Sequence, residues 1–243
     1  LVFAPGNLSE PSAELAPSVL APHASVVDME FDAARNLWLL ISFSDESFIG
    51  LVGFTPAQAM AAALGIDPDP IPAWELTVQG MIAPSDMAFA SDGSLWIADF
   101  GNDQAPLLQL DPSSFPPSGE ISPLQAVLPS VQNGDTMVAL QGANNVLLDS
   151  VDGMWVNWWT SIAISRGSQG SYATPEQVYN SEIVTSLPSG LALDAQGGIW
   201  WGDEPQDGSG RLYHLANGAS APDQALSSSA IPSPLDMSFD PRP

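Results

Sequence analysis

A short pattern of polar and apolar residues recurs along the chain. In its first copy, residues 28–32 alternate between polar and apolar, a four-residue stretch follows, and residues 37–40 form an apolar run that contains Trp38. Period-two alternation is typical of a strand with one buried face. The intervening stretches are rich in Gly, Asn, Asp and Ser, which favour tight turns. The pattern therefore predicts a β-hairpin.

Five copies of this hairpin pattern are visible, the last one cut short. They begin at Asp28, Asp86, Met137, Gly190 and Asp236, which is a spacing of about fifty residues. The third copy is degenerate and allows two registers. We prefer Met137–Gln141 followed by Val146–Leu148, because this register spaces the copies more evenly. The other register runs from Leu148-Asp149 to Met154-Trp155, and it keeps the interval of six residues between Asp and Trp.

Further strands are expected after each hairpin. Third strands are predicted at Phe48–Phe54, Leu107–Leu110, Ile162–Ile164 and Leu212–Leu215. A weaker fourth strand, such as Trp74–Val78, follows a polar or Pro-rich connection. Four strands in roughly 40–50 residues are typical of a propeller blade. We therefore predict an all-β propeller with four-stranded antiparallel blades as one domain over residues 1–243. Five blades are preferred and six are the alternative, and N- and C-terminal strands close the ring.

One connection predicts a short helix on the rim. Thr55 can cap it, Pro56 suits its first turn, residues 59–64 are strong helix formers, and Gly65 can end it.

Two copies resemble a known repeat. Residues 90–99 read Ala-Ser-Asp-Gly-Ser-Leu-Trp-Ile-Ala-Asp, and residues 190–200 read Gly-Leu-Ala-Leu-Asp-Ala-Gln-Gly-Gly-Ile-Trp. Both resemble the NHL-type propeller repeat, a class that includes gluconolactonase-like and regucalcin-like propellers. Residues 54–58, Phe-Thr-Pro-Ala-Gln, resemble bacterial secreted members with long blades. The resemblance covers most of the chain and implies the architecture, which hosts enzymes, binding modules and scaffolds alike.

Composition narrows the classes of partner. The 243 residues include 28 Asp and Glu against four arginines and no lysine, for a net charge of −24. Such a chain repels phosphate backbones, so we expect no nucleic-acid partner. No apolar run approaches the roughly 20 residues that span a bilayer. The absence of cysteine removes disulfides and thiolate sites. Together with Leu1 in place of an initiating methionine, this composition favours an extracytoplasmic protein that is secreted, periplasmic or at the cell surface.

Acidic residues begin three of the inner strands. In a propeller these positions lie at one mouth of the central channel, where carboxylates repel one another unless a hard cation such as Ca²⁺ is bound. Regucalcin-like enzymes hold a metal there, so the resemblance implies a metal site. The candidate metal ligands are Asp28, Asp86 and Asp236. The alternative is that each Asp accepts hydrogen bonds from the backbone of the adjacent turn.

The loops between second and third strands open on the same face. Their candidate ligand-binding residues are Asp99, Asn102, Trp158, Trp159, Asp203 and Glu204. Trp38, Trp96 and Trp200 recur at one repeat position and are predicted to pack between blades. Residues 157–159, Asn-Trp-Trp, break that pattern and predict aromatic surface for a sugar or protein. Filling a gap between blades is the alternative interpretation.

The sequence contains few groups of residues that could form a catalytic site. His23 and His214 fall in different blades, so we do not expect them to converge on a metal or complete a Ser-His-Asp triad. Two acids among Asp28, Asp86 and Glu204 could form the carboxylate pair of a glycosidase. The distance between the two carboxyl groups would then decide whether hydrolysis retains or inverts the stereochemistry. We assign no catalytic residue.

The sequence therefore predicts a secreted or cell-surface propeller that acts as a binding or scaffold module for a protein or carbohydrate partner. Calcium is the candidate cation at its acidic mouth. The alternative function is a metal-assisted hydrolase or lactonase that works at the same mouth.

Overall fold

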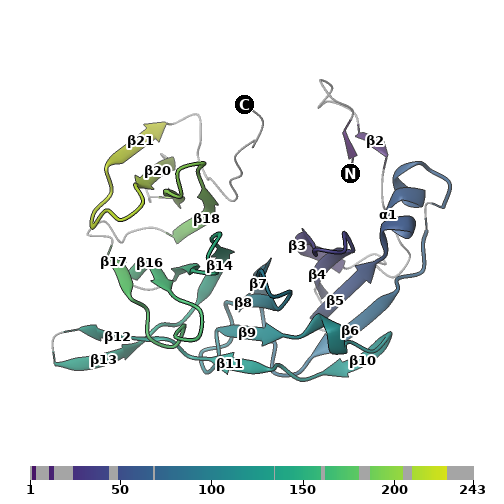
Figure 1. Cartoon of the computed structure of the whole chain (residues 1–243), viewed down its shortest axis with the longest axis horizontal. Helices are drawn as coiled ribbons and strands as arrows, with labels where there is room; N and C mark the ends of the chain where they lie inside the picture. The colour runs from purple at the N-terminus through teal and green to yellow at the C-terminus, as the bar shows by residue number, and fades with distance from the viewer. Residues whose placement is uncertain are drawn as a thin grey trace.

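The chain folds mainly into strands that form separate sheets around a common centre (Figure 1). The computed structural model describes residues 2–3, 11–13, 24–43, 49–67, 69–133, 135–159, 162–180, 187–204 and 210–228. Four of its sheets each contain four antiparallel strands, and we number these sheets blades 1 to 4. In three of them the four strands follow one another in the chain, and in blade 2 the chain visits a neighbouring sheet before it forms the last strand. Their innermost strands lie nearest the centre (Figure 1).

Blade 1 holds the first copy of the repeat. Its strands are β3 (Ala24–Phe31), β4 (Leu37–Phe43), β5 (Ile49–Phe54) and β6 (Trp74–Val78). The predicted helix, α1 (Pro56–Ala63), follows β5. It begins with a capping box, in which Thr55 and Gln58 satisfy each other's backbone amides.

Blade 2 is linked to blade 1 by an excursion of its own chain. Its strands are β7 (Pro84–Phe89), β8 (Leu95–Asp99), β9 (Leu107–Leu110) and β11 (Gln125–Val127). After β9, the 3₁₀ turn η2 (Pro112–Ser114) leads into β10 (Ser118–Ile121). Strand β10 leaves its blade and pairs parallel with β6. The prediction of purely antiparallel blades is wrong at this edge, because β10 covers the outer strand of blade 1.

Blades 3 and 4 are regular four-stranded meanders. Blade 3 consists of β14 (Ala143–Leu148), β15 (Met154–Trp158), β16 (Ile162–Gly167) and β17 (Gln177–Asn180). Blade 4 consists of β18 (Leu187–Leu193), β19 (Ile199–Glu204), β20 (Gly210–Leu215) and β21 (Gln224–Ser228).

The preferred register of the third copy is wrong and the alternative is correct. Residues 143–148 form the inner strand of blade 3, and 154–158 form its second strand. Residues 136–139, which we expected as the inner strand, form β13 (Thr136–Ala139) of a separate hairpin with β12 (Ser130–Asn133). Period-two alternation identifies a strand but not its partner, so the hairpin resembled a blade hairpin in sequence.

Large side chains fill the spaces between successive blades. Trp38 is 2% exposed and belongs to a cluster with residues of blade 2, such as Met87 and Ile97. Trp96 is 1% exposed and meets Tyr172 of blade 3 edge to face at 4.9 Å. The predicted packing role of these two tryptophans is confirmed, and a separate hydrophobic cluster lies between each pair of adjacent blades.

Within the described residues, four blades follow one another along an arc (Figure 1). The fifth blade and the closure of the ring were predicted from segments 1–7 and 236–243, which lie mostly outside the described residues. Of these, Val2–Phe3 forms β1, which pairs with β2 (Pro11–Ala13) in a two-stranded sheet. Five blades and a closed ring therefore stay predictions. No helix in the described part of the chain is both long and apolar enough to cross a bilayer.

Candidate functional site

The inner strands of blades 1 to 3 carry one polar residue each at an equivalent position, just after a break in strand register. Each of these side chains accepts a hydrogen bond from a backbone amide of the next blade, so together they form an inter-blade ladder. The three contacts are Asp28 to the Met87 amide (3.0 Å), Asp86 to the Val146 amide (2.9 Å) and Asn145 to the Gly190 amide (3.0 Å). The ladder aligns neighbouring inner strands around the axis.

Two members of the ladder, Asp28 and Asp86, lie close together, because the Met87 amide donates to both carboxylates at 3.0 Å. Burial raises the pKa of Asp86 well above its usual range, and the charge of Asp28 and a hydrogen bond between the two carboxyl groups raise it further. The Val146 amide and Asn145 act in the opposite direction. The raised pKa favours the protonated form of Asp86, which can donate to the Asp28 carboxylate.

The described residues include two of the three predicted metal ligands, Asp28 and Asp86, whose carboxylates accept the Met87 and Val146 amides. Ca²⁺ takes six to eight oxygen ligands, so these two residues do not form a calcium site by themselves, and calcium binding stays a prediction. The described residues contain no group of three His, Cys, Asp or Glu side chains that could hold a metal. Asp236 lies outside the described residues, and its predicted role as a ligand stays a prediction.

Two predicted ligand-binding residues of blade 2 face inward. Asp99 is 0% exposed, and its carboxylate accepts the amides of Ile82 (2.7 Å) and Ala83 (2.8 Å). Burial raises the pKa of Asp99 although these amides lower it. Asn102 is 7% exposed and donates to the Gly80 carbonyl at 2.8 Å. Both side chains tie the β8–β9 loop to the start of β7, which confirms that these two segments share one face of the molecule.

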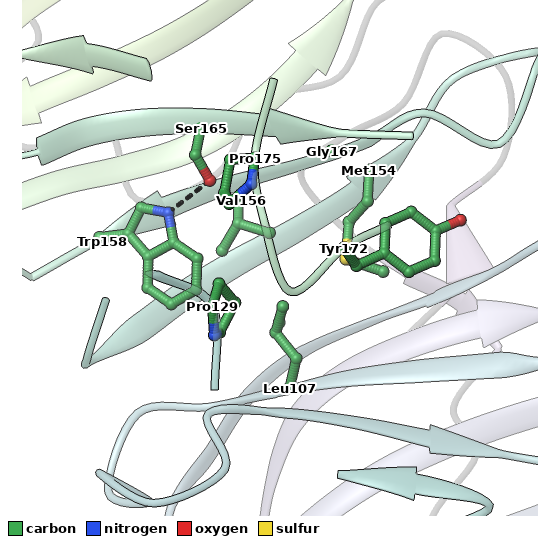
Figure 2. A pocket seen from close by; sticks show the side chains of 9 residues that line it. All are labelled: Leu107, Pro129, Met154, Val156, Trp158, Ser165, Gly167, Tyr172 and Pro175. Carbon is green, nitrogen blue, oxygen red and sulfur yellow. Dashed lines mark hydrogen bonds between the residues drawn. The ribbon is translucent and has the colours of Figure 1, made fainter. Parts of the chain in front are cut away.

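Trp158 also lies inside the protein, so the expectation of an exposed aromatic surface is wrong for this residue. Its side chain is 0% exposed, and its indole N–H donates to the Ser165 hydroxyl at 2.8 Å. It lines a cavity of only about 10 Å³ between blades 2 and 3, together with Leu107, Val156 and Tyr172 (Figure 2). This volume is at most about that of a single water, so Trp158 contributes to packing.

Trp159, the next residue, is presented at the surface. It is 49% exposed, and Phe100 of blade 2 meets it edge to face at 5.0 Å with the ring planes at 73°. A Cβ atom added at Gly142 would lie 2.7 Å from the Trp159 Cβ and 3.5 Å from Phe100, so glycine allows both rings to approach. Ile82, 55% exposed, packs close to Gly101 in the same loop region. We call Ile82, Phe100 and Trp159 the mouth patch.

The remaining candidates lie in blade 4. The backbones of Asp203 and Glu204 end β19, where they pair with Pro188 and Leu187, and their side chains fall outside the described part of the structure. Their roles in ligand binding stay predictions. Sequence reasoning missed Phe100 and Ile82. The available signal was an aromatic residue, Phe100, inside an otherwise polar turn between Asp99 and Asn102.

Comparison with solved structures supports the fold. A gluconolactonase from Xanthomonas campestris matches with a TM-score of 0.53 and 14% identity, over 94% of this chain and 75% of that one. The fold is a β-propeller. A protein of unknown function from Bacteroides caccae matches with a TM-score of 0.50 and 11% identity, over 84% of this chain and 61% of its own. The Dos1 propeller is less similar, with a TM-score of 0.47, 12% identity, and coverage of 89% and 51%.

These matches show architecture alone, because their identities are low. The chain spans less than two thirds of the Bacteroides caccae and Dos1 structures. No protein-family model matches the sequence, and none of the curated proteins resembles it closely enough to count as a relative. The NHL-type assignment of the repeat therefore stays a prediction.

Proposed function

We propose that this propeller is a binding or scaffold module that recognises its partner through the mouth patch. The observation that carries the proposal is the half-exposed indole of Trp159, which Phe100 holds in place from the neighbouring blade. Tryptophan is enriched among the residues that dominate the energy of protein interfaces. A rigid aromatic ring that bridges two blades loses little conformational entropy when a partner covers it.

The geometry of the acids supports binding over metal-assisted hydrolysis. A hydrolytic metal centre needs carboxylate oxygens that are free to bind the metal. The oxygens of Asp28, Asp86 and Asp99 instead accept backbone amides. In the described residues, the acids predicted at the mouth serve the framework of the propeller.

The chemistry of the patch favours a protein partner over a carbohydrate. Sugars are usually held by polar side chains around an aromatic ring, which hydrogen-bond their hydroxyl groups. Asp99 and Asn102, the nearest candidates for that role, are buried and satisfied by backbone groups. The patch is left with three apolar side chains, and a chain of net charge −24 favours a neutral or basic partner. We also propose that this module lies outside the cytoplasm, in keeping with its acidic, lysine-free composition.

The experiment compares three immobilised proteins as bait: the native chain, Trp159→Ala and Met60→Ala. Met60 is 59% exposed on α1 and serves as a matched apolar control away from the patch. We expect a protein to be retained by the native chain and the control, identified, and then shown with purified components to bind Trp159→Ala at least ten-fold more weakly. Equal melting temperatures would establish that all three proteins are folded.

Three outcomes would overturn the proposal. Equal retention by Trp159→Ala would remove the patch from recognition. Binding of the native chain to arrayed glycans, with loss in Trp159→Ala, would replace the protein partner with a carbohydrate. Hydrolysis of a lactone that is lost on chelation and in Asp28→Asn would favour the metal-assisted enzyme.

A further inference from the structure

Blade 3 contains a frame of five residues that includes a partly buried ion pair. The Asp149 carboxylate follows β14, accepts the Gly153 amide at 2.7 Å and binds the Arg166 guanidinium at 2.7 Å. Arg166 also lies 3.8 Å from Glu176, and its guanidinium carbon sits 5.7 Å from the centre of the Trp155 ring. A guanidinium between two carboxylates and an aromatic face is a recurrent cation site in proteins. In blade 3 the cation in this site is the protein's own Arg166.

Blade 4 repeats this frame with matching atoms. Asp194 follows β18, accepts the Gly198 amide at 2.8 Å and lies 2.9 Å from His214 Nε2. Asp223 lies 2.7 Å from His214 Nδ1, although the geometry makes no regular hydrogen bond. His214 pairs with Trp200 across the strands and contacts its ring at 4.6 Å, as Arg166 pairs with Trp155. Blade 4 therefore has two acids and a tryptophan at the positions that they occupy in blade 3, and the shorter His214 imidazole stands in place of the Arg166 side chain.

The two frames differ in what lies against them. In blade 3, Trp155 packs into a cluster with Leu191 and Trp201, so blade 4 covers the frame. In blade 4, the frame borders a cleft of about 750 Å³. The described residues place no further blade against it. Among the described residues, the polar and aromatic side chains that line this cleft are Asp194, Gln196, Trp200, His214, Asn217 and Gln224.

We propose that the blade 4 cleft binds the arginine side chain of a protein partner. In blade 3, a frame of two acids and a tryptophan holds a guanidinium. Blade 4 has an equivalent frame, which borders the open cleft. Asp194 keeps its charge: burial raises its pKa, but the Gly198 amide and His214 outweigh this effect and hold the pKa below its usual range. Asp223 is not among the described residues that line the cleft, but its half-exposed carboxylate lies 2.7 Å from Nδ1 of His214, which does line it. The net charge of −24 attracts a basic partner over long range.

The proposal is independent of the mouth patch and is tested on the full chain with defined peptides. Binding of acetyl-Gly-Arg-Gly-amide and of its lysine counterpart is measured by calorimetry, and the imidazole proton resonances locate the site, because the chain has only two histidines. We expect saturable binding of the arginine peptide that shifts one imidazole resonance, with the lysine peptide at least about five-fold weaker. Trp159→Ala should leave this binding unchanged.

Two variants and one control make the test specific. Asp223→Asn should weaken the arginine peptide about ten-fold. Glu75→Gln, which removes one charge from an exposed position of β6, should leave binding unchanged. His214→Arg places the blade 3 residue into blade 4 and should abolish binding without lowering the melting temperature, because the protein then fills its own frame. Equal losses in Asp223→Asn and Glu75→Gln, equal affinity for the lysine peptide, or no saturable binding would overturn the proposal. Free arginine binding as tightly as the peptide would also overturn it, because the occupant would then be a small molecule.

Discussion

Replacing Asp86 by asparagine tests whether the raised pKa of Asp86, a member of the inter-blade ladder, lowers the stability of the native chain at neutral pH. Asparagine keeps a carbonyl oxygen that can accept the Val146 amide, which now lies 2.9 Å from the Asp86 carboxylate. It also keeps an N–H group that can donate to Asp28. The variant therefore reproduces the protonated form of Asp86 without its titration. We expect Asp86→Asn to be more stable than the native chain at neutral pH and equally stable near pH 4.

The sign follows from the direction of the pKa shift. The pKa of Asp86 in the folded chain lies above its unfolded value because of burial and the neighbouring Asp28. The folded state therefore binds more protons than the unfolded state between the two values, and stability falls as the pH rises from the unfolded to the folded pKa. Each unit of elevation removes about 1.4 kcal/mol of unfolding free energy. For a chain of this size, that amounts to about 3–6 °C in melting temperature.

The assay is thermal unfolding of the native chain, Asp86→Asn and Asp86→Ala across pH 4 to 8. Asp86→Ala leaves the Val146 amide without its acceptor, so it should be about 2 kcal/mol, or about 4–8 °C, less stable than Asp86→Asn at every pH. A gap between the native chain and Asp86→Asn that opens as the pH rises supports the raised pKa of Asp86. An Asp86→Asn variant that is less stable at neutral pH, or a gap independent of pH, would refute the reasoning.

Three further predictions concern contacts within single blades and between neighbours. Asp152 has a left-handed backbone (φ 55), and its carboxylate accepts hydrogen bonds from the amide and the hydroxyl of Ser91 in blade 2. Asp152→Ala should therefore lower the unfolding free energy, measured by denaturant titration, by about 2–3 kcal/mol, and Asp152→Asn should lower it less. Burial and nearby acids raise the pKa of Tyr172 to about 12, so an ultraviolet titration should show a phenol that ionises about two units later than free tyrosine and is missing in Tyr172→Phe. Thr55→Ala removes half of the capping box with Gln58 and should cost about 1 kcal/mol, measured by urea unfolding; a change below a few tenths would mean that α1 does not depend on its cap.

The elements that sequence predicted correctly are those with local signals. Strands at Trp74–Val78 and Leu107–Leu110 match β6 and β9, because each is a short apolar or alternating run between turn residues. Helix α1 was predicted from its capping residue and its alanines, which act within one turn of the chain. Such signals depend on neighbours in sequence, so they survive without knowledge of the tertiary structure.

The errors came from interactions between distant segments. Residues 136–139 alternate like an inner strand, but their partner is residues 130–133 of a hairpin. Nothing local to β10 predicted its parallel pairing with β6 of another repeat. At the site, the repeat correctly located Asp28 and Asp86 on equivalent inner-strand positions. It could not tell whether their oxygens face a ligand or bind the Met87 and Val146 amides, because that depends on the spacing between blades.

The same limit applies to the aromatic residues. The break in the repeat at residues 157–159 marked a place where ordinary blade packing stops. Strand alternation then places Trp158 and Trp159 on opposite sides of the chain, one 0% and the other 49% exposed. Trp158 is the one that faces the core, where it contacts Ser165 and other residues of blade 3. Trp159 faces outward, where it packs against Phe100.

Calcium titration tests most directly whether the channel acids belong to the framework rather than to a metal site. Melting temperatures of the native chain and Asp86→Asn are recorded in increasing CaCl₂, with MgCl₂ as the matched control for general screening of the acidic surface. Our account predicts the same modest shift for both cations and both proteins. A larger shift with calcium that saturates in the native chain and disappears in Asp86→Asn would contradict it.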